Sequence, residues 1–341
     1  MKIRQILLPT SIRVRVTLLI ILVSVVCISI VGIVSLHRTK LILTREAREK
    51  LLLNVQLQSA LFEQEIKRVK ATEQTIESII LSNISHYSEK DSATIKKIKE
   101  NSITHMLKWG QLASPLSMWV VFNPQWAKGA NTISFLLNEK TNSYDREQEY
   151  DISKMNLGSI QYAWWTKAIE NGEVWTDPYY WENWNKTLIS YSKALYYKNS
   201  LVACIGSDFD FTQLKANWMN VKLYQTGYLM LLDQSYNIII HPNKLEMNVK
   251  DAITPQYYTT LVQATNAANE GVLTYKYGKQ EKILAYHKLS NNWLLLATVP
   301  LNEIFLPLNK IIKTMLGLML FAIVLTVFLS YHFSKKRDAL S

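Results

Sequence analysis

The chain contains few of the residues that interrupt or cross-link a backbone. Its 341 residues include only 10 glycines, 8 prolines and 2 cysteines. Cys27 lies in a long apolar run, and Cys204 lies in a short apolar segment typical of a buried strand. This placement argues against a disulfide framework, and a domain of this size can build its core without one. We expect Cys204 to be a core residue rather than a reactive thiol.

The sequence also lacks the short motifs that carry well-known chemistries. It has no Gly-rich phosphate loop, no Gly-x-Ser-x-Gly elbow and no His-Glu-x-x-His. His241 and His287 have no second ligand at metal-binding spacing, so we interpret both as structural. Of the net charge of +11, six charges lie in the two terminal flanks, and the remaining basic residues are interspersed with acidic ones, which does not indicate a nucleic-acid partner. We therefore expect no catalytic residue, no metal and no cofactor.

Two long hydrophobic runs lie near the two ends of the chain. Residues 16–36 and 314–331 contain no charged side chain, and each run can cross a hydrocarbon core of about 30 Å as a helix. The flanks outside the runs are short and rich in Lys and Arg, which predicts that both termini are cytoplasmic. The large segment between the runs is then extracytoplasmic. A cleaved signal peptide is the alternative for the first run, which exceeds the usual hydrophobic region of about 7–15 residues.

The segment after the first run predicts a long helix. No glycine or proline occurs from residue 38 to residue 109, and apolar residues recur at helical spacing on one narrow stripe. The stripe also includes the polar residues Ser59 and Glu73. Two interpretations stay open. The helix is either a signalling stalk that dimerises along this stripe, or a helix packed on its own domain.

Short β-branched and aromatic runs separated by turn residues follow the helix and predict antiparallel strands. The first part contains two expected strand pairs around a polar segment, 138–159. In the second part, two strands, a helix that begins at Pro255 and three strands follow one another. That order is typical of a PAS-like antiparallel sheet, so the expected fold class is α+β.

Aromatic residues are concentrated between residues 162 and 197. Five of the ten tryptophans lie within 21 residues of one another in this stretch. The whole stretch also contains six tyrosines. Large rings with a polar edge line many small-molecule pockets. The alternative interpretation is that most of these rings pack in a core.

At this stretch the sequence resembles the double Cache (dCache) extracytoplasmic sensor domains of bacterial chemoreceptors, sensor kinases and diguanylate cyclases. The resemblance covers nearly the whole segment between the hydrophobic runs, and it implies two tandem PAS-like modules in a bacterial inner-membrane sensor. The matching motifs are Trp164-Trp165-Thr-Lys-Ala168, Gly172-Glu-Val-Trp175-Thr-Asp177-Pro178-Tyr179-Tyr180, Ile189-Ser190-Tyr191-Ser192, Ile205-Gly206-Ser207-Asp208, Tyr224-Gln-Thr-Gly227-Tyr228 and His241-Pro242.

The expected organisation follows from the hydrophobic runs and the resemblance together. An extracytoplasmic sensor, 37–312, lies between two transmembrane helices. The expected parts are a cytoplasmic flank (1–15), a transmembrane helix (16–36), a stalk helix (37–90), a membrane-distal module (91–222), a membrane-proximal module (223–300), a second transmembrane helix (313–332) and a cytoplasmic tail (333–341).

The resemblance also implies a ligand site in the membrane-distal module. In amino-acid-sensing members, an Arg two positions before a Trp holds the ligand carboxylate, an Asp in a Gly-x-Asp stretch holds the ammonium, and a Tyr after Pro packs over the ligand. Trp164, Tyr179 and Asp208 match, but Tyr162 stands at the position of the arginine. A bidentate carboxylate clamp needs a guanidinium, so this departure favours an amine or another cation. The expected ligand-binding residues are Tyr162, Trp164, Trp165, Tyr179, Tyr191 and Asp208.

We therefore expect a sensor that binds an amine or amino-acid-like molecule and passes its signal through the helix from Leu301 into the second run. We also expect a homodimer, and an output domain either in a longer chain or in a partner, because ten residues after Tyr331 are too few for one. Two alternatives remain, a membrane adaptor protein and a doubly anchored carbohydrate-active enzyme. The enzyme would use a pair of carboxylates beside the tryptophans. The available carboxylates are Asp177, Glu182, Asp208 and Asp210.

Overall fold

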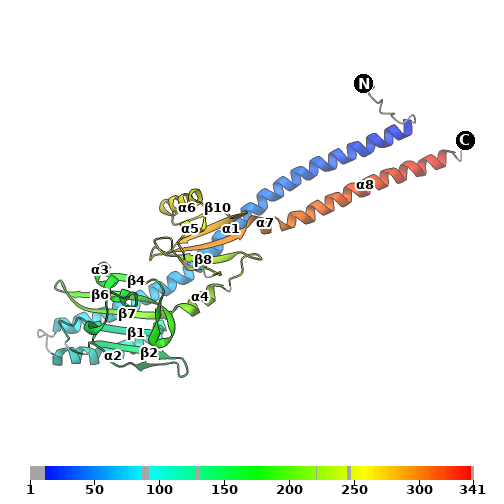
Figure 1. Ribbon diagram of the computed structural model, residues 1–341. Coiled ribbons are helices and arrows are strands. Elements are labelled where there is room, and N and C mark those ends of the chain that lie inside the picture. The colour runs from blue at the N-terminus through cyan, green and yellow to red at the C-terminus, as the bar shows by residue number, and fades with distance from the viewer. Residues whose placement is uncertain are drawn as a thin grey trace.

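One very long helix, α1 (Ile12–His86), organises the α+β fold, and two antiparallel sheet modules are stacked along it (Figure 1). Its 75 residues correspond to about 110 Å at 1.5 Å per residue. The helix is continuous from the first hydrophobic run into the modules. The computed structural model describes residues 12–86, 92–127, 129, 131–219, 221–243 and 247–338.

The distal module lies at the end of α1 far from the hydrophobic run, and its sheet has the order β3-β2-β1-β7-β6-β4, with β5 also paired to β6. All of its strand pairs are antiparallel. The strands are β1 (Ser117–Phe122), β2 (Thr132–Asn138), β3 (Ser143–Arg146), β4 (Glu173–Trp175), β5 (Tyr179–Trp181), β6 (Lys186–Tyr197) and β7 (Ser200–Asp210). The helices are α2 (Ser92–Ala113), η1 (Ile152–Lys154), η2 (Ile160–Tyr162), α3 (Ala163–Asn171), η3 (Glu182–Trp184) and α4 (Phe211–Met219).

The proximal module follows α4 and has a sheet of order β10-β11-β12-β8-β9, again antiparallel throughout. From its last strand the chain passes through a short helix into a long apolar one. The strands are β8 (Tyr228–Leu232), β9 (Ile238–Ile240), β10 (Glu270–Tyr277), β11 (Gln280–Lys288) and β12 (Leu294–Pro300). The helices are α5 (Val249–Ala252), α6 (Pro255–Ala267), α7 (Leu301–Ile304) and α8 (Leu306–Asp338).

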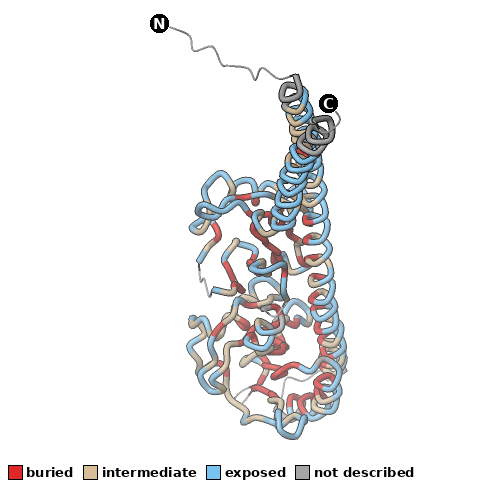
Figure 2. Tube along the Cα trace, turned by 90° about the vertical axis from the view of Figure 1, so that its right-hand side faces the viewer, coloured by how far each residue is buried: buried red, intermediate tan, exposed pale blue. Residues whose placement is uncertain are grey.

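A single stripe of α1 packs against one face of both sheets. Val55 and Phe62 belong to a core shared with the proximal sheet, and Ile76 and Ile80 belong to a core shared with α2 and the distal sheet. Figure 2 shows the buried side of the helix turned toward the modules and the exposed side turned away. Of the two interpretations left open for the stripe, these contacts support packing of the helix on its own domain.

The opposite face of each sheet carries a second core. In the distal module this core contains the tryptophans of α3, and in the proximal module it contains side chains of β8, β11, β12 and α6. Each module is therefore layered in the same way, with α1 on one face of the sheet and shorter helices on the other. A cavity lies on the face away from α1 in both modules.

The two apolar helices lie side by side at one end of the molecule, so that the described ends of the chain point in the same direction (Figure 1). By length and composition, α1 and α8 each contain a segment able to cross a membrane, and their apolar surface is largely exposed. The predicted second transmembrane helix, 313–332, lies within α8. Residues 1–11 and 339–341 lie outside the described residues, as does most of the predicted cytoplasmic flank.

Candidate functional site in the distal module

A cavity of about 260 Å³ lies on the face of the distal sheet away from α1. Half of its lining residues are Trp or Tyr, two are acidic, and none of the described lining residues is basic. The walls come from all parts of the module: the central strands, the segment after β3, and the elements from α3 to η3. The lining residues are Trp119, Ser134, Glu147, Gln148, Tyr150, Trp164, Tyr179, Trp181, Asn183, Trp184, Leu188 and Asp208.

Strand alternation brings the polar floor of this cavity together. Asp208 of β7 lies opposite Ser117 of β1 on one side and opposite Ser190 of β6 on the other. Paired residues of neighbouring strands share one face of a sheet, so the three side chains form a row across its centre. The next residue back, Ser207, points to the other face, toward α1.

Asp208 is only 4% exposed, and both of its carboxylate oxygens accept hydrogen bonds from neutral donors. Ser117 Oγ donates at 2.5 Å and Trp119 Nε1 at 3.2 Å to Oδ2, while Ser190 Oγ donates at 2.5 Å to Oδ1. The Tyr179 hydroxyl lies 2.7 Å from Ser190 Oγ and extends the network. Burial raises the pKa of Asp208 against the lowering effect of these donors. Such a carboxylate gains from a positively charged partner.

Glu147, which follows β3, supplies the second acid of the lining. Its Oε1 accepts a hydrogen bond from Trp184 Nε1 at 3.2 Å. Burial raises its pKa, and its negative charge adds to the upward shift of the pKa of Asp208. Neither acid has an ion-pair partner among the residues that the structure describes. The cavity therefore carries two acidic groups and no compensating cation.

Aromatic rings enclose the space above these acids. The ring centroids of Trp119 and Trp164 are 4.3 Å apart, and those of Trp181 and Trp184 are 6.0 Å apart. Tyr179 meets Trp181 edge to face at 6.3 Å. The negative face of such rings attracts organic cations, most strongly for tryptophan. An acidic pocket walled by indoles is chemically suited to an amine.

The predicted site residues occupy four different kinds of position. Trp164, Tyr179 and Asp208 line the cavity. Tyr162 lies just behind the lining, with its ring centroid 6.1 Å from that of Trp164. Trp165 is buried in the core beneath, in edge-to-face contact with Trp164 at 6.3 Å.

Tyr191 lies on the opposite face of the sheet, outside the cavity. Its hydroxyl donates to Glu173 Oε2 at 2.8 Å, and Lys70 Nζ of α1 lies 5.6 Å from its ring centroid. The register explains this placement, because Tyr191 pairs with Ser207 rather than with Asp208. Its position is therefore that of a contact between sheet and helix.

The carboxylates considered for a hydrolytic pair do not meet in one place. Asp177 pairs with Lys167 at 3.2 Å, and Asp210 pairs with Lys186 at 2.6 Å. Of the set, Asp208 alone belongs to the lining. No group of three or more His, Cys, Asp or Glu residues within the described part of the chain could hold a metal ion.

Several lining residues had no signal that could have marked them in the sequence. Glu147 and Tyr150 lie in the polar segment 138–159, where no hydrophobic alternation indicates the short strand β3. Trp119 lies in an expected strand, but only the pairing of β1 with β7 shows that it faces Asp208. Trp181 and Trp184 belong to the aromatic cluster that the sequence singled out.

A sequence profile of the Cache domain, in its double form, matches residues 39–308. The chain belongs to the Cache domain family. The match covers both modules and most of the part of α1 that packs on them. A comparison with curated protein sequences gives no match.

Solved Cache-type sensory domains share the fold. The periplasmic sensory domain of the Campylobacter jejuni chemoreceptor Tlp1 is 17% identical, with a TM-score of 0.58, over 78% of this chain and 99% of that one. The ligand-binding domain of Mlp24 with asparagine is 18% identical, with a TM-score of 0.51, over 78% and 97%. The Campylobacter jejuni Tlp3 domain in complex with L-valine is 16% identical, with a TM-score of 0.50, over 78% and 97%. These Cache relatives are sensory or ligand-binding domains.

Proposed function

We propose that this Cache protein is a membrane-anchored extracytoplasmic sensor that binds a small organic cation, such as an amine, in the distal cavity. One observation carries the proposal: among the described residues, Asp208 is buried beside indole rings with neutral donors only, and none of the described lining residues is basic. An ammonium group entering the cavity supplies the missing charge. The indole faces then add cation–π attraction of about 0.5–2 kcal/mol.

The same lining disfavours an ordinary amino acid. The Mlp24 and Tlp3 domains were solved with asparagine and L-valine. An amino acid brings a carboxylate, which in this cavity would face Asp208 and Glu147 without an Arg, Lys or His among the described lining residues. Burying an unpaired carboxylate costs several kcal/mol, of the order of its desolvation penalty. A ligand with a positive group and no negative one avoids that cost.

The apolar helices supply the anchor in this proposal. The hydrophobic parts of α1 and α8 run side by side and span one membrane, with both termini on the cytoplasmic side. The basic flanks of the sequence support that orientation. The modules then lie outside, with the distal cavity far from the membrane.

The signal route in this proposal starts at β7. Asp208 faces the ligand, while the adjacent Ser207 donates a hydrogen bond to Glu73 Oε1 of α1 at 2.9 Å. The ligand shifts the balance between two arrangements of sheet and helix by the difference in its affinity for them. The change then reaches the membrane through α1, and through α7 into α8.

We also infer that the sensor acts as a homodimer along α1. Leu53, Leu57 and Leu61 recur every four residues on the exposed side of the helix, and they are 65%, 56% and 53% exposed. Residues at this spacing lie on one helical face. Two copies anchored in the same membrane would present these faces to each other in parallel.

Calorimetric titration of the full chain in lipid nanodiscs tests the ligand class. We expect tetramethylammonium or 1,4-diaminobutane to bind, and succinate not to bind. Asp208→Asn should weaken amine binding by about tenfold or more, since a buried charge pair loses one partner. Asp177→Asn, an exposed carboxylate changed in the same way, is the matched control. Binding of anions or amino acids alone would contradict the proposal.

A further inference from the structure

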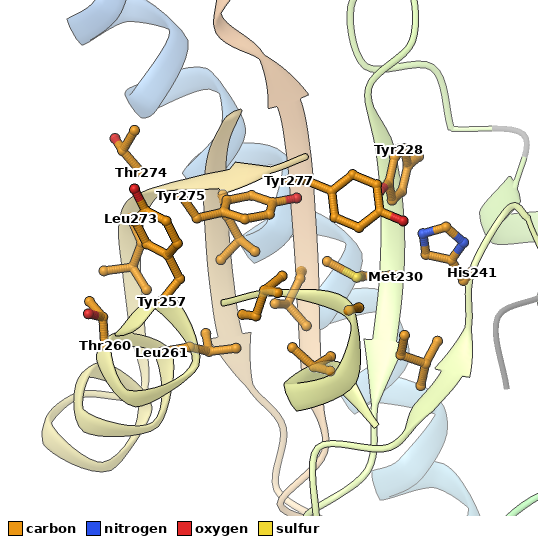
Figure 3. A pocket seen from close by; sticks show the side chains of 16 residues that line it. Tyr228, Met230, His241, Tyr257, Thr260, Leu261, Leu273, Thr274, Tyr275 and Tyr277 are labelled. Carbon is orange, nitrogen blue, oxygen red and sulfur yellow. The ribbon is translucent and has the colours of Figure 1, made fainter. Parts of the chain in front are cut away.

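The proximal module contains a second cavity, of about 40 Å³, whose chemistry differs from that of the distal one. It lies on the face of the sheet away from α1 and is closed by α5 and α6 (Figure 3). Its body is apolar: Met230, Leu284 and Leu296 come from the strands, and Leu261 comes from α6. A pocket of this size and composition fits a compact apolar group.

The polar groups of this cavity gather at one end. Figure 3 shows Tyr228, Tyr277 and His241 together there, while Tyr257 and Leu261 lie at the end near α6. His241 Nδ1 accepts the backbone N–H of Asn243 at 3.1 Å, so the neutral ring carries its proton on Nε2. That N–H has no hydrogen-bond acceptor among the described residues.

A buried cation stands beside the same end. Lys282 of β11 is 7% exposed, and its Nζ lies 5.2 Å from the ring centroids of both Tyr228 and Tyr277. Within the described part of the chain, its ammonium has neither a hydrogen bond nor a carboxylate within 4.0 Å. Buried charges in proteins are normally paired, so this one lacks an anion.

Among the described residues, the one acid that acts electrostatically on Lys282 is Glu303, and it is already hydrogen-bonded elsewhere. Glu303 of α7 raises the pKa of Lys282 against the larger lowering effect of burial. Its carboxylate accepts the backbone N–H groups of Gln225 and Thr226 and the hydroxyl of Thr226. The Glu303 carboxylate therefore holds the backbone at residues 225–226 and does not form an ion pair with the lysine. An anionic ligand could supply the partner that Lys282 lacks among the described residues.

We propose that the proximal cavity is a second ligand site, for a compact monocarboxylate. The apolar body of the ligand enters the cavity among Met230, Leu284 and Leu296. Its carboxylate pairs with the Lys282 ammonium and accepts a hydrogen bond from His241. The site is independent of the distal one and selects a ligand of opposite charge.

The position of this site gives it a direct connection to the membrane-spanning helix. Lys282 pairs in the sheet with Pro300, the last residue of β12 before α7 and α8. An anion that moves the Lys282 side chain would act on β12, the strand that leads into α7 and α8. The proximal ligand is therefore a second input, close to the membrane.

Titration calorimetry of the full chain in nanodiscs, with isovalerate and benzoate as probes, tests the site. Isovaleramide and benzamide are neutral probes of the same shape and should bind at least about tenfold more weakly, since they cannot form the ion pair. Lys282→Met keeps the apolar stem and removes the charge, and it should weaken carboxylate binding by about tenfold or more. Lys279→Met, in the exposed turn before β11, is the matched control and should leave carboxylate binding unchanged.

A second variant protects the test against a folding defect in Lys282→Met. Ala252→Phe places a ring in the cavity and leaves the ammonium in place, so it should abolish carboxylate binding. Both variants should still bind the amine probe of the distal cavity, which reports an intact fold. The proposal is refuted if neither carboxylate binds at millimolar concentration, or if the amides bind equally well. It is also refuted if either variant still binds the amine and binds the carboxylates as tightly as the unmodified protein does. Any of these results leaves the distal site unaffected.

Discussion

Replacing Glu73 by Gln should change how the stability of the protein depends on pH. Glu73 of α1 is fully buried against β7, and its Oε1 accepts a hydrogen bond from Ser207 Oγ at 2.9 Å. Its Oε2 has no hydrogen-bond partner. Burial raises the pKa of this carboxyl well above its ordinary value, although Ser207 and the positive charge of Lys193 act in the opposite direction.

The sign of the effect follows from the raised pKa. Between the pKa of Glu73 in the unfolded chain and its higher pKa in the folded protein, the folded state binds the proton and the unfolded state has released it. The free energy of unfolding therefore falls as pH rises through this window, by about 1.4 kcal/mol per pH unit. Gln has the shape of the protonated acid and cannot ionise. The Glu73→Gln protein should match the unmodified one near pH 4 and exceed it in stability at higher pH.

Urea unfolding of the full chain in nanodiscs, followed by tryptophan fluorescence, measures this difference. All ten tryptophans lie between residues 109 and 293, so the signal reports the two modules and not the apolar helices. Asp208 and Glu147, whose pKa values burial also raises, are present in both proteins. Their own titrations are common to both proteins, and the charge of Asp208, which raises the pKa of Glu73, acts in the direction of the expected difference.

Glu49→Gln is the matched control, because Glu49 is an exposed acid on the same helix that pairs only with Arg45 one turn away. Its unfolding curve should follow that of the unmodified protein at every pH from 5 to 8. The reasoning fails if Glu73→Gln and the unmodified protein lose stability in parallel over that range. It also fails if Glu73→Gln is the less stable protein at pH 8.

Two further predictions concern the packing behind the distal site and the proposed dimer. A Cβ at Gly206 would clash with the ring of Trp119 and the carbonyl oxygen of Tyr191, so Gly206→Ala should destabilise the protein by about 1–3 kcal/mol and weaken amine binding. Urea unfolding measures the stability, and calorimetry measures the affinity for the amine. If both values are unchanged, neither stability nor amine binding depends on the position of the Trp119 ring. Leu57→Lys should dissociate the dimer without altering amine affinity, as measured by sedimentation in detergent; an unchanged sedimentation coefficient would contradict the role of that helix face.

The sequence predicted the proximal module closely because its strands are short, apolar and bounded by clear turns. The helix expected to begin at Pro255 is α6, and the two strands expected before it and the three expected after it are present in that order. The long helix was also predicted, since no helix breaker occurs between residues 38 and 109. Its stripe was identified, but the surface that covers it became clear only from the structure.

The distal site could be predicted only in part, because the register between strands depends on tertiary pairing and not on the local sequence alone. Shifting a register by one residue moves a side chain to the other face of the sheet. Tyr191 and Asp208 stand on neighbouring strands and were both expected at the ligand, yet they face opposite sides. Trp119 reaches the cavity through the pairing of β1 with β7, which lie far apart in the chain, and Glu147 follows β3, a strand without hydrophobic alternation.

The same alternation that separates Tyr191 from the cavity gives the protein a physical connection between ligand and helix. Ser207 and Asp208 are consecutive in β7, and one contacts α1 while the other faces the cavity. The negative charge of Asp208 raises the pKa of Glu73, and a cation bound beside Asp208 would offset that charge. In the proximal module the layers repeat, with α1 on one face and the cavity of the proposed carboxylate site on the other. Two ligands of opposite charge would thus act on one helix from the far faces of two sheets, and neither ligand needs to touch it.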